Sequence, residues 1–424
     1  MKFINQPKIH IRSLISFVIS AALIANLAGC SVNVKADNLM SGISANKVSG
    51  KVTDEEFVNS VSQFSIELFK NSIRDKENSL VSPLSVLIAL SMTANGAEGE
   101  TLTQMEKVLG LDIPIGELNE YMYTYVNNLP NGYKSKLNIA NSIWFRDNKG
   151  SFTVDEAFLQ KNSDYYKAAV YKSPFNSQTV EDINNWAKKN TNNMINKVVE
   201  DIDANTVMLL INAVAFDAKW KNVYTKNDVQ NGSFTSIDGS VQNIDFMHSS
   251  ETKYISNNKV SGFIKPYFKS KYSFVALLPN INVSIKDYIA SLTGNDFVNS
   301  IKSAKDTSVI AYLPKFSYNY SITLNDTLEN LGMPKAFSPD EAEFGKLGKS
   351  SDGNIYIGNV LHKTFISVDE LGTKAGAVTK IEMQDNSAEM AEKIVMLDRP
   401  FVYAIIDNST NLPVFIGTVM SMGN

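Results

Sequence analysis

One stretch of the sequence, residues 372–383, limits what this chain can fold into more than any other. Read with a period of two, one of its faces carries Thr373, Ala375, Ala377, Thr379, Ile381 and Met383. The opposite face carries Lys374, Gly376, Val378, Lys380 and Glu382. Small or apolar residues on one side and mostly charged residues on the other are typical of a half-buried strand.

The same stretch has little intrinsic tendency to form that strand. Glycine and alanine are poor strand formers. The next residues, 384–392, are polar and have no buried face of either period. We therefore interpret the stretch as a segment that is a loop in one state of the protein and a strand in another.

These residues resemble the hinge of the reactive-centre loop of inhibitory serpins. That hinge has an acidic residue, one spacer, a glycine, a threonine or serine, and then small residues. The matching positions here are Glu370, Gly372, Thr373, Ala375, Gly376, Ala377 and Thr379. Residues 364–369 fit the strand that leads into the hinge, and residues 399–401 and 413–417 resemble the C-terminal hairpin of the family. The resemblance implies a reactive-centre loop at about residues 370–395.

Other serpin motifs occur in the family's order over residues 54–424. Ser82-Pro83 resembles the start of the family's second helix, and Asn212 with Trp220 resembles a strand under the site of loop insertion. Residues 313–316 and 328–333 match two further signatures. Each motif alone is weak, but their order and spacing identify the chain as a member of the serpin family.

The residue patterns independently predict an α+β fold. A capping box at residues 53–56 begins a helix that buries Phe57, Val61, Phe64 and Leu68. Helical patterns dominate the first half of the chain and apolar strand-like runs the second, which favours antiparallel sheets over βαβ repeats. No linker interrupts residues 53–424, so we expect one domain there. The resemblance implies three mostly antiparallel sheets, about eight or nine helices and an exposed reactive-centre loop.

The N-terminal residues are typical of an export signal. Lys2, Lys8 and Arg12 precede an apolar run, residues 14–27, that ends in a motif resembling the lipobox of bacterial lipoproteins. Cys30, the only cysteine, occupies the lipidated position of that motif. We expect residues 1–29 to be a lipoprotein signal peptide. We expect Cys30 to carry lipid, with palmitate among the attached acyl chains. The alternatives are a transmembrane anchor and an ordinary cleaved signal.

Residues 30–52 are expected to be the lipidated cysteine and a polar tether without periodic structure. The domain beyond would be exported, anchored to the cell membrane through lipid, and face outside. The sequence leaves open whether residues 31–50 pack on the domain.

No pattern in the sequence supports catalysis, a metal or a cofactor. Only three histidines exist, and no nucleophile elbow, zinc motif, phosphate loop or dinucleotide fingerprint occurs. The net charge of −4 without a basic run argues against nucleic acid as a partner. Residues 102–127 contain a single lysine, Lys107, where serpins regulated by sulfated polysaccharides carry a basic stripe, so no heparin site is expected.

The resemblance implies a sheet-opening cluster, a set of residues beneath the central sheet where its strands part. Its members would be Ser82, Ser85, Asn184, Asn212, Trp220 and His362. A satisfied core histidine is the plainer interpretation of His362, and physically it requires the same paired polar groups.

The mechanism implied by the resemblance is suicide inhibition by a monomer. A protease attacks the loop, forms an acyl-enzyme, and is carried along as the cut loop inserts into the central sheet. Thr373 to Asn386 is 14 residues, so insertion would move the protease roughly 45 Å at about 3.3 Å per residue. A domain of this size has a radius of gyration of about 21 Å, so the protease would travel most of the length of the molecule. Because the loop would insert only after cleavage, the native state would be metastable and held by a kinetic barrier.

Two positions for the cleaved bond remain open. Counting from Glu370 places it at Asn386–Ser387, which we prefer, whereas counting back from Pro400 places it near Glu389–Met390. Neither site has Lys or Arg, so the target protease is not expected to be trypsin-like. The alternative function is that of a non-inhibitory serpin, a binding or structural surface protein whose loop never inserts.

Overall fold

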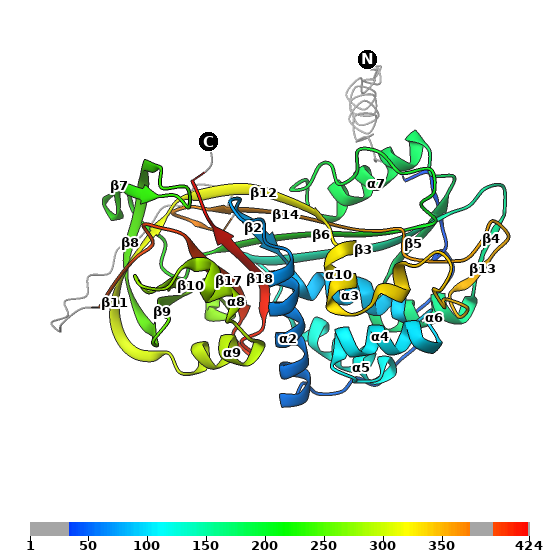
Figure 1. Ribbon diagram of the computed structural model, residues 1–424, viewed down its shortest axis with the longest axis horizontal. Helices are drawn as coiled ribbons and strands as arrows, with labels where there is room; N and C mark the ends of the chain where they lie inside the picture. Colours follow the sequence, from blue (N-terminus) through cyan, green and yellow to red (C-terminus); the bar gives the residue numbers. More distant parts are fainter. Residues whose placement is uncertain (1–33, 374–392, 423–424) are drawn as a thin grey trace, which may run out of the picture. The chain divides into compact units, whose positions relative to one another are not determined.

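Three β-sheets and nine α-helices make up residues 34–373 and 393–422, the part of the chain that this computed structural model describes. All three sheets belong to one compact unit, residues 35–424. The predicted α+β class, the three sheets and the approximate number of helices are confirmed. Figure 1 shows the long strands of one sheet spanning this unit and most helices below them.

The first sheet has seven strands in the order β1-β5-β3-β6-β15-β14-β12. Their bounds are β1 Asp37–Asn38, β3 Ser135–Arg146, β5 Ala169–Ser173, β6 Met208–Lys219, β12 Phe316–Thr323, β14 Asn359–Val368 and β15 Gly372–Thr373. Most pairings are antiparallel, as expected, but β3 pairs parallel with β5 and β6 parallel with β14. Because β6 and β14 are parallel, a segment that turns back after β14 can enter between them antiparallel to both.

The second sheet has nine strands in the order β16-β11-β8-β9-β10-β17-β18-β2, with β7 paired to β8. Their bounds are β2 Ser79–Val81, β7 Val229–Thr235, β8 Val241–Ser256, β9 Val260–Pro266, β10 Tyr272–Pro279, β11 Lys305–Pro314, β16 Lys393–Met396, β17 Phe401–Asp407 and β18 Pro413–Val419. A small third sheet pairs β4 Phe152–Val154 with β13 Gly348–Ser350.

Helices cover both faces of the seven-stranded sheet. Figure 1 places α3, α4 and α5 on one face and α7 on the other. Their bounds are α2 Glu55–Asn71, α3 Pro83–Ala94, α4 Gly99–Gly110, α5 Ile115–Asn128, α6 Glu156–Tyr166, α7 Ser177–Asn190, α8 Ile285–Ala290, α9 Gly294–Lys302 and α10 Asn325–Leu331. Every residue of α3 is buried, because this helix is packed between the sheets and its neighbouring helices.

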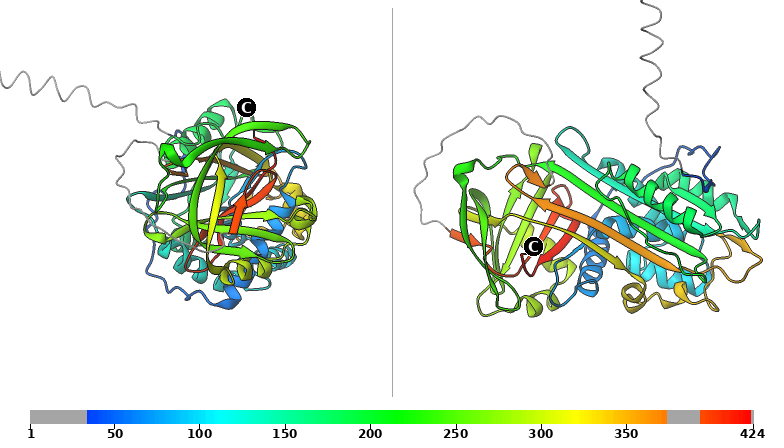
Figure 2. Two further views of the ribbon diagram at one scale, coloured as in Figure 1. Left: turned by 90° about the vertical axis from the view of Figure 1, so that its left-hand side faces the viewer. Right: turned by 90° about the horizontal axis from the view of Figure 1, so that it is seen from above.

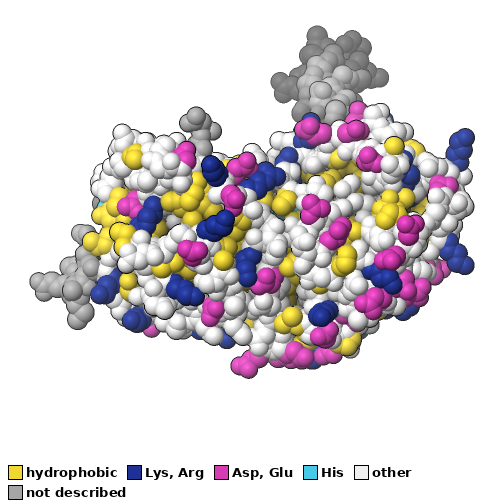
Figure 3. Space-filling model, viewed as in Figure 1, with side chains coloured by type: hydrophobic (Ala, Val, Ile, Leu, Met, Phe, Trp, Pro, Cys, Tyr) yellow, Lys and Arg dark blue, Asp and Glu magenta, His cyan; other side chains and the backbone are white. Residues whose placement is uncertain are grey.

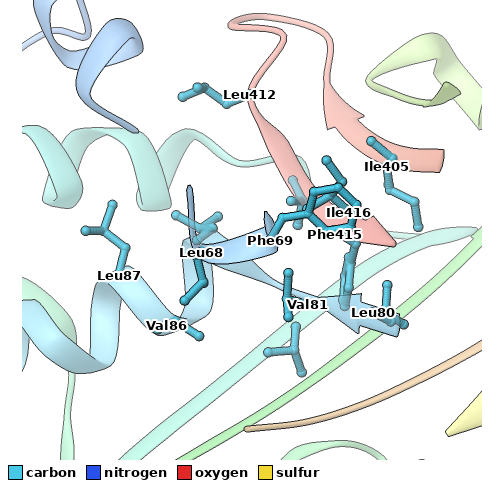
Figure 4. Close-up of a cluster of buried hydrophobic side chains, with 14 of the residues drawn as sticks. Leu68, Phe69, Leu80, Val81, Val86, Leu87, Ile405, Leu412, Phe415 and Ile416 are labelled. Atoms are coloured by element: carbon cyan, nitrogen blue, oxygen red, sulfur yellow. The ribbon is translucent and has the colours of Figure 1, made fainter. Parts of the chain in front are cut away.

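The core lies where α2 and α3 meet the C-terminal hairpin. Figure 4 shows Leu68 and Phe69 of α2, Leu80 and Val81 of β2, and Phe415 and Ile416 of β18 gathered in one cluster. Every residue of β17 and β18 is buried, so these strands are covered on both faces. Strands buried on both faces require continuous apolar runs, which the sequence has here.

The starts of α2 and α3 agree with the sequence patterns to within one residue. Asp54, not Thr53, is the N-cap of α2, and its carboxylate accepts the amide N–H of Phe57. Phe57, Val61, Phe64 and Leu68 are buried as predicted. Ser82 is the N-cap of α3 with Pro83 following it, but the Ser82 hydroxyl makes no capping bond.

Residues 35–51, part of the predicted polar tether whose packing the sequence left open, lie on the domain as a strap. In this strap β1 pairs with β5, and the amide of Ala36 donates to the Asp182 carboxylate at 2.8 Å. Further along, the Asn46 amide donates to Asp164 and the Lys51 amide donates to the Glu120 carbonyl. The domain therefore begins near residue 35 rather than 53. The sequence of the strap shows no hydrophobic periodicity, because the strap is held by a two-residue edge strand and by scattered hydrogen bonds rather than by a buried apolar face.

Candidate functional site: the loop hinge and the sheet-opening cluster

The hinge begins inside the seven-stranded sheet. After β14 ends at Val368, residues 369–371 turn back, and β15 enters between β14 and β6. Thr373 pairs with Val368 on one side and with Ala218 on the other. Further along the same two strands, β6 and β14 pair directly, with His362 opposite Asn212. In the right-hand view of Figure 2, the green strand β6 and the orange strand β14 lie side by side. The two strands are thus already apart at one end and joined at the other.

Gly372 is required by the close approach of β6. A Cβ atom at this position would lie 2.0 Å from the carbonyl oxygen of Ala218, a separation that no side chain tolerates. Glycine therefore lets β15 enter the sheet without displacing the β6 backbone. The sequence identified this glycine only as a member of the hinge motif.

Trp220 and Tyr224 hold the backbone of the turn. The amide of Trp220 donates to the Leu371 carbonyl at 2.9 Å, and its indole N–H donates to the Asp369 carbonyl at 2.9 Å. The amide of Tyr224 donates to the Glu370 carbonyl at 2.9 Å. Trp220 therefore contacts the hinge itself, so these two hydrogen bonds are a physical basis for its predicted role in sheet opening.

Glu370 is tied to the neighbouring strand by an ion pair. Its carboxylate lies 2.7 Å from the ammonium group of Lys315, which also lies 3.0 Å from the carboxylate of Asp245. Partial burial opposes ionisation of Glu370, but Lys315 outweighs it and holds the pKa of this carboxyl below its usual value. The acidic residue of the hinge thus anchors the first turn of the loop to the adjacent strands.

Thr373 is buried, as expected for the inward face of the segment. Its hydroxyl lies 2.5 Å from the hydroxyl of Tyr267, and the Tyr267 ring stacks on Trp220 with centroids 4.5 Å apart. Burial raises the pKa of Tyr267, so this hydroxyl stays protonated and available for the hydrogen bond.

A buried ion pair that the sequence did not reveal lies beside Trp220. The Lys265 ammonium group is 2.8 Å from Glu251, 5.4 Å from the centroid of the Trp220 ring and 4.2 Å from that of Tyr224. The side chains of Lys265 and Glu251 are 2% and 9% exposed. Burial opposes the charge of Lys265, but Tyr224 and Glu251 raise the pKa of its ammonium group above the ordinary value.

The sheet-opening cluster is centred on His362 and Asn212. The ring of His362 accepts the Ser82 amide N–H at Nε2, 3.0 Å away, and contacts the Asn212 side-chain oxygen through Nδ1. A neutral ring with its proton on Nδ1 satisfies both bonds. Burial lowers the pKa of His362 to about 3, so the ring is uncharged at neutral pH.

Asn141, not Asn184, completes this cluster. The Asn212 amide group donates to Asn141 Oδ1 at 2.6 Å and to Ser85 Oγ at 2.5 Å, and Ser85 Oγ donates to Asn141 Oδ1 at 3.0 Å. The predicted Asn184 bonds instead to the backbone of residues 198 and 199. The alternation of side chains along β3 could have indicated this, because Asn141 lies on the same face as the apolar residues Ile139 and Ile143.

The remaining predicted site residues lie outside the described part of the chain. These are the hinge residues Ala375, Gly376, Ala377 and Thr379, the candidate bonds Asn386–Ser387 and Glu389–Met390, and Cys30. Within the described ranges, no helix has the length and apolar character needed to cross a bilayer.

A hinge that enters a sheet between two parallel strands, which pair directly further along at the buried sheet-opening cluster, is typical of a serpin-type protein. The family model described as "Serpin (serine protease inhibitor)" matches residues 59–422. The chain belongs to the serpin family.

Relatives agree over most of the chain. An uncharacterised serpin-like protein of Thermococcus kodakarensis is 28% identical, and the match covers 87% of this chain and 86% of the relative. Homo sapiens neuroserpin is 30% identical, and the match covers 82% of this chain and 86% of neuroserpin. The thermophilic serpin tengpin in its native state superposes with a TM-score of 0.89, 58% identity, 92% coverage of this chain and 100% of its own. For tengpin in the latent state the TM-score is 0.79 with 57% identity, 88% coverage of this chain and 100% of its own.

Proposed function

We propose that this protein inhibits a protease as a suicide substrate. The observation that carries the proposal is the position of β15, in which Thr373 already pairs with both strands that an inserted loop would join. Insertion would extend this short strand rather than start a new one. A loop that begins in the sheet needs no separate nucleation step.

In the proposed reaction the protease nucleophile attacks the carbonyl carbon of Asn386. The bond from this carbon to the nitrogen of Ser387 breaks, the amine leaves, and the acyl group stays on the protease. The freed loop then extends β15 and carries the acyl-enzyme away before water hydrolyses it. The absence of Lys and Arg at Asn386 and at the alternative, Glu389–Met390, favours a target that is not trypsin-like, a serine or a cysteine protease.

The alternative is a non-inhibitory serpin whose loop never inserts. Insertion would be blocked by proline or by bulky or charged residues on the inward face. The first four residues of that face, Thr373, Ala375, Ala377 and Thr379, are all small, and the bulkier Ile381 and Met383 come only at its far end. This favours the inhibitory function.

The experiment is to mix residues 31–424 with chymotrypsin-like, elastase-like, subtilisin-like and cysteine proteases. A covalent adduct on a denaturing gel, with cleavage after Asn386 located by mass spectrometry, is the expected result. Clean cleavage by every protease, without adduct and without a gain in thermal stability, would favour the non-inhibitory alternative.

We further propose that the protein is exported and anchored to the membrane through lipid on Cys30, facing outside, where it acts as a monomer. The lipobox-like motif before the only cysteine supports this. Cells grown with labelled palmitate should yield labelled protein, and Cys30→Ala should abolish the label and release the protein from the membrane fraction. Label retained by Cys30→Ala would refute the anchor.

A further inference from the structure

A pocket of about 530 Å³ lies between α2, α8, the β7–β8 turn and the end of β18. Its walls are mostly aliphatic. The apolar lining residues are Ile73, Ile237, Ile285, Ile289, Ala290 and Met420. None of them belongs to the hinge or to the sheet-opening cluster. The volume is in the range of pockets that hold small molecules, about 300–1,000 Å³.

The walls of this pocket are fixed by hydrogen bonds. The Ile237 amide donates to the Met420 carbonyl at 2.8 Å, joining the β7–β8 turn to the end of β18. The side chain of Asn78 accepts the amides of Met420 at 2.7 Å and Ser421 at 3.1 Å, and donates to the Ser421 carbonyl at 2.9 Å. The cavity is therefore formed before any ligand arrives, and binding requires little ordering of the protein.

The rim of the pocket is basic. Three lysines, Lys70, Lys76 and Lys286, stand against one acid, Asp75. Lys286 is 3.9 Å from Asp75 with both side chains more than four-fifths exposed, and Lys70 pairs with Glu67 at 3.0 Å. In the part of the chain that the structure describes, Lys76 makes no ion pair. On the face shown in Figure 3, hydrophobic side chains gather in the left half with Lys and Arg side chains around them.

Aliphatic walls under a lysine rim select an amphipathic anion. A neutral apolar molecule would leave the lysine charges unused, and an amphipathic cation would be repelled by them. We propose that this pocket, which we name the lysine-rimmed pocket, binds a small molecule with one aliphatic chain and a carboxylate head, the class of a medium-chain fatty acid. The chain would lie against Ile285 and Ile289, and the head would meet Lys76 and Lys286.

The test is isothermal titration calorimetry of residues 31–424, which include the whole compact unit, with decanoate below its micelle concentration. Decanol is the uncharged control ligand. We expect one decanoate per protein and binding of decanol at least about tenfold weaker. No binding of decanoate, or equal binding of decanol, would overturn the proposal.

Two variants locate the site. Ala290 is exposed at the pocket, so Ala290→Trp should fill it without touching the core and abolish binding; Ala157→Trp, at an exposed alanine of α6, is the matched control and should bind normally. The double variant Lys76→Glu with Lys286→Glu should weaken decanoate about tenfold, and Lys302→Glu on α9 should not. Undiminished binding by Ala290→Trp would place decanoate elsewhere and refute the assignment.

Discussion

The Lys265 ammonium group lies 2.8 Å from the Glu251 carboxylate, and both side chains are buried. The same ammonium group lies 5.4 Å from the ring centroid of Trp220, the residue that holds the hinge. Removing one partner leaves the other charge buried and alone. We expect Lys265→Met to lower the free energy of unfolding by about 3–5 kcal/mol. The urea midpoint of the native protein measures this change.

The double variant Lys265→Met with Glu251→Met measures the contribution of the ion pair apart from the cost of leaving one charge buried without its partner. Replacing both charges by apolar side chains should restore most of the loss, since such replacements are often neutral or stabilising. Lys253→Met, which breaks the exposed pair of Lys253 with Asp306, is the control and should cost less than about 1 kcal/mol. A double variant as unstable as Lys265→Met would show that the pair itself stabilises the fold.

Thr373→Arg should keep the hinge out of the sheet. Arginine would bring a charge between Tyr267 and β6, and burying an unpaired ion costs several kcal/mol. Under the proposed function we expect the target protease to cleave this variant as a substrate, without a covalent adduct on a denaturing gel. Thr153→Arg, on an exposed position of β4, should form the adduct. An adduct with Thr373→Arg as abundant as in the parent would count against insertion.

His362 should make the protein less stable in acid. Its pKa is about 3 in the folded protein and 6.5 in the unfolded chain, so between these values the unfolded chain binds the extra proton. Stability from this group is complete above pH 6.5 and falls by up to about 1.4 kcal/mol per pH unit as the pH drops toward 3. Urea midpoints between pH 4 and 7 measure the slope.

His362→Gln tests the origin of that slope. It should cost about 1–3 kcal/mol at pH 7 through lost buried hydrogen bonds, yet depend less on pH than the parent. Replacing His248 by Asn should leave the His362 contribution intact. Equal slopes in parent and His362→Gln would mean that other groups cause the acid sensitivity.

Asp182→Ala should release the start of the strap. The carboxylate of Asp182 is buried and accepts the Ala36 amide and the Gln178 side-chain amide. We expect faster hydrogen exchange at residues 36–39 and a loss of about 1–2 kcal/mol. Glu181→Ala, at an exposed neighbour on α7, should change neither. Unchanged exchange in Asp182→Ala would mean that β1 pairing alone holds the strap.

The sequence predicted the hinge because its pattern is local. Alternation of small and charged residues identifies a strand-competent segment, and the buried Thr373 agrees with the face assigned to it. That Gly372 and Thr373 already lie in the sheet was not predictable, since periodicity gives the face of a strand but not which state is populated.

Contacts between distant strands were the main omissions. Glu251 and Lys265 lie on β8 and β9, and their pairing depends on a register that neither strand specifies alone. Asn184 was assigned to the cluster in place of Asn141, because a resemblance between motifs does not fix which asparagine faces His362. The strap was read as a tether because edge pairing of two residues leaves no period.

The pairing of Thr373 with both Val368 and Ala218 also fixes the register of any strand that grows from it. Side chains alternate strictly between the faces of a sheet, so a shift of one residue would turn Lys374, Lys380 and Glu382 inward. Growth from an already aligned residue avoids that error. Under the proposed function, the two residues of β15 would thus act as a template that keeps the charged side of the loop facing away from the core at every later step.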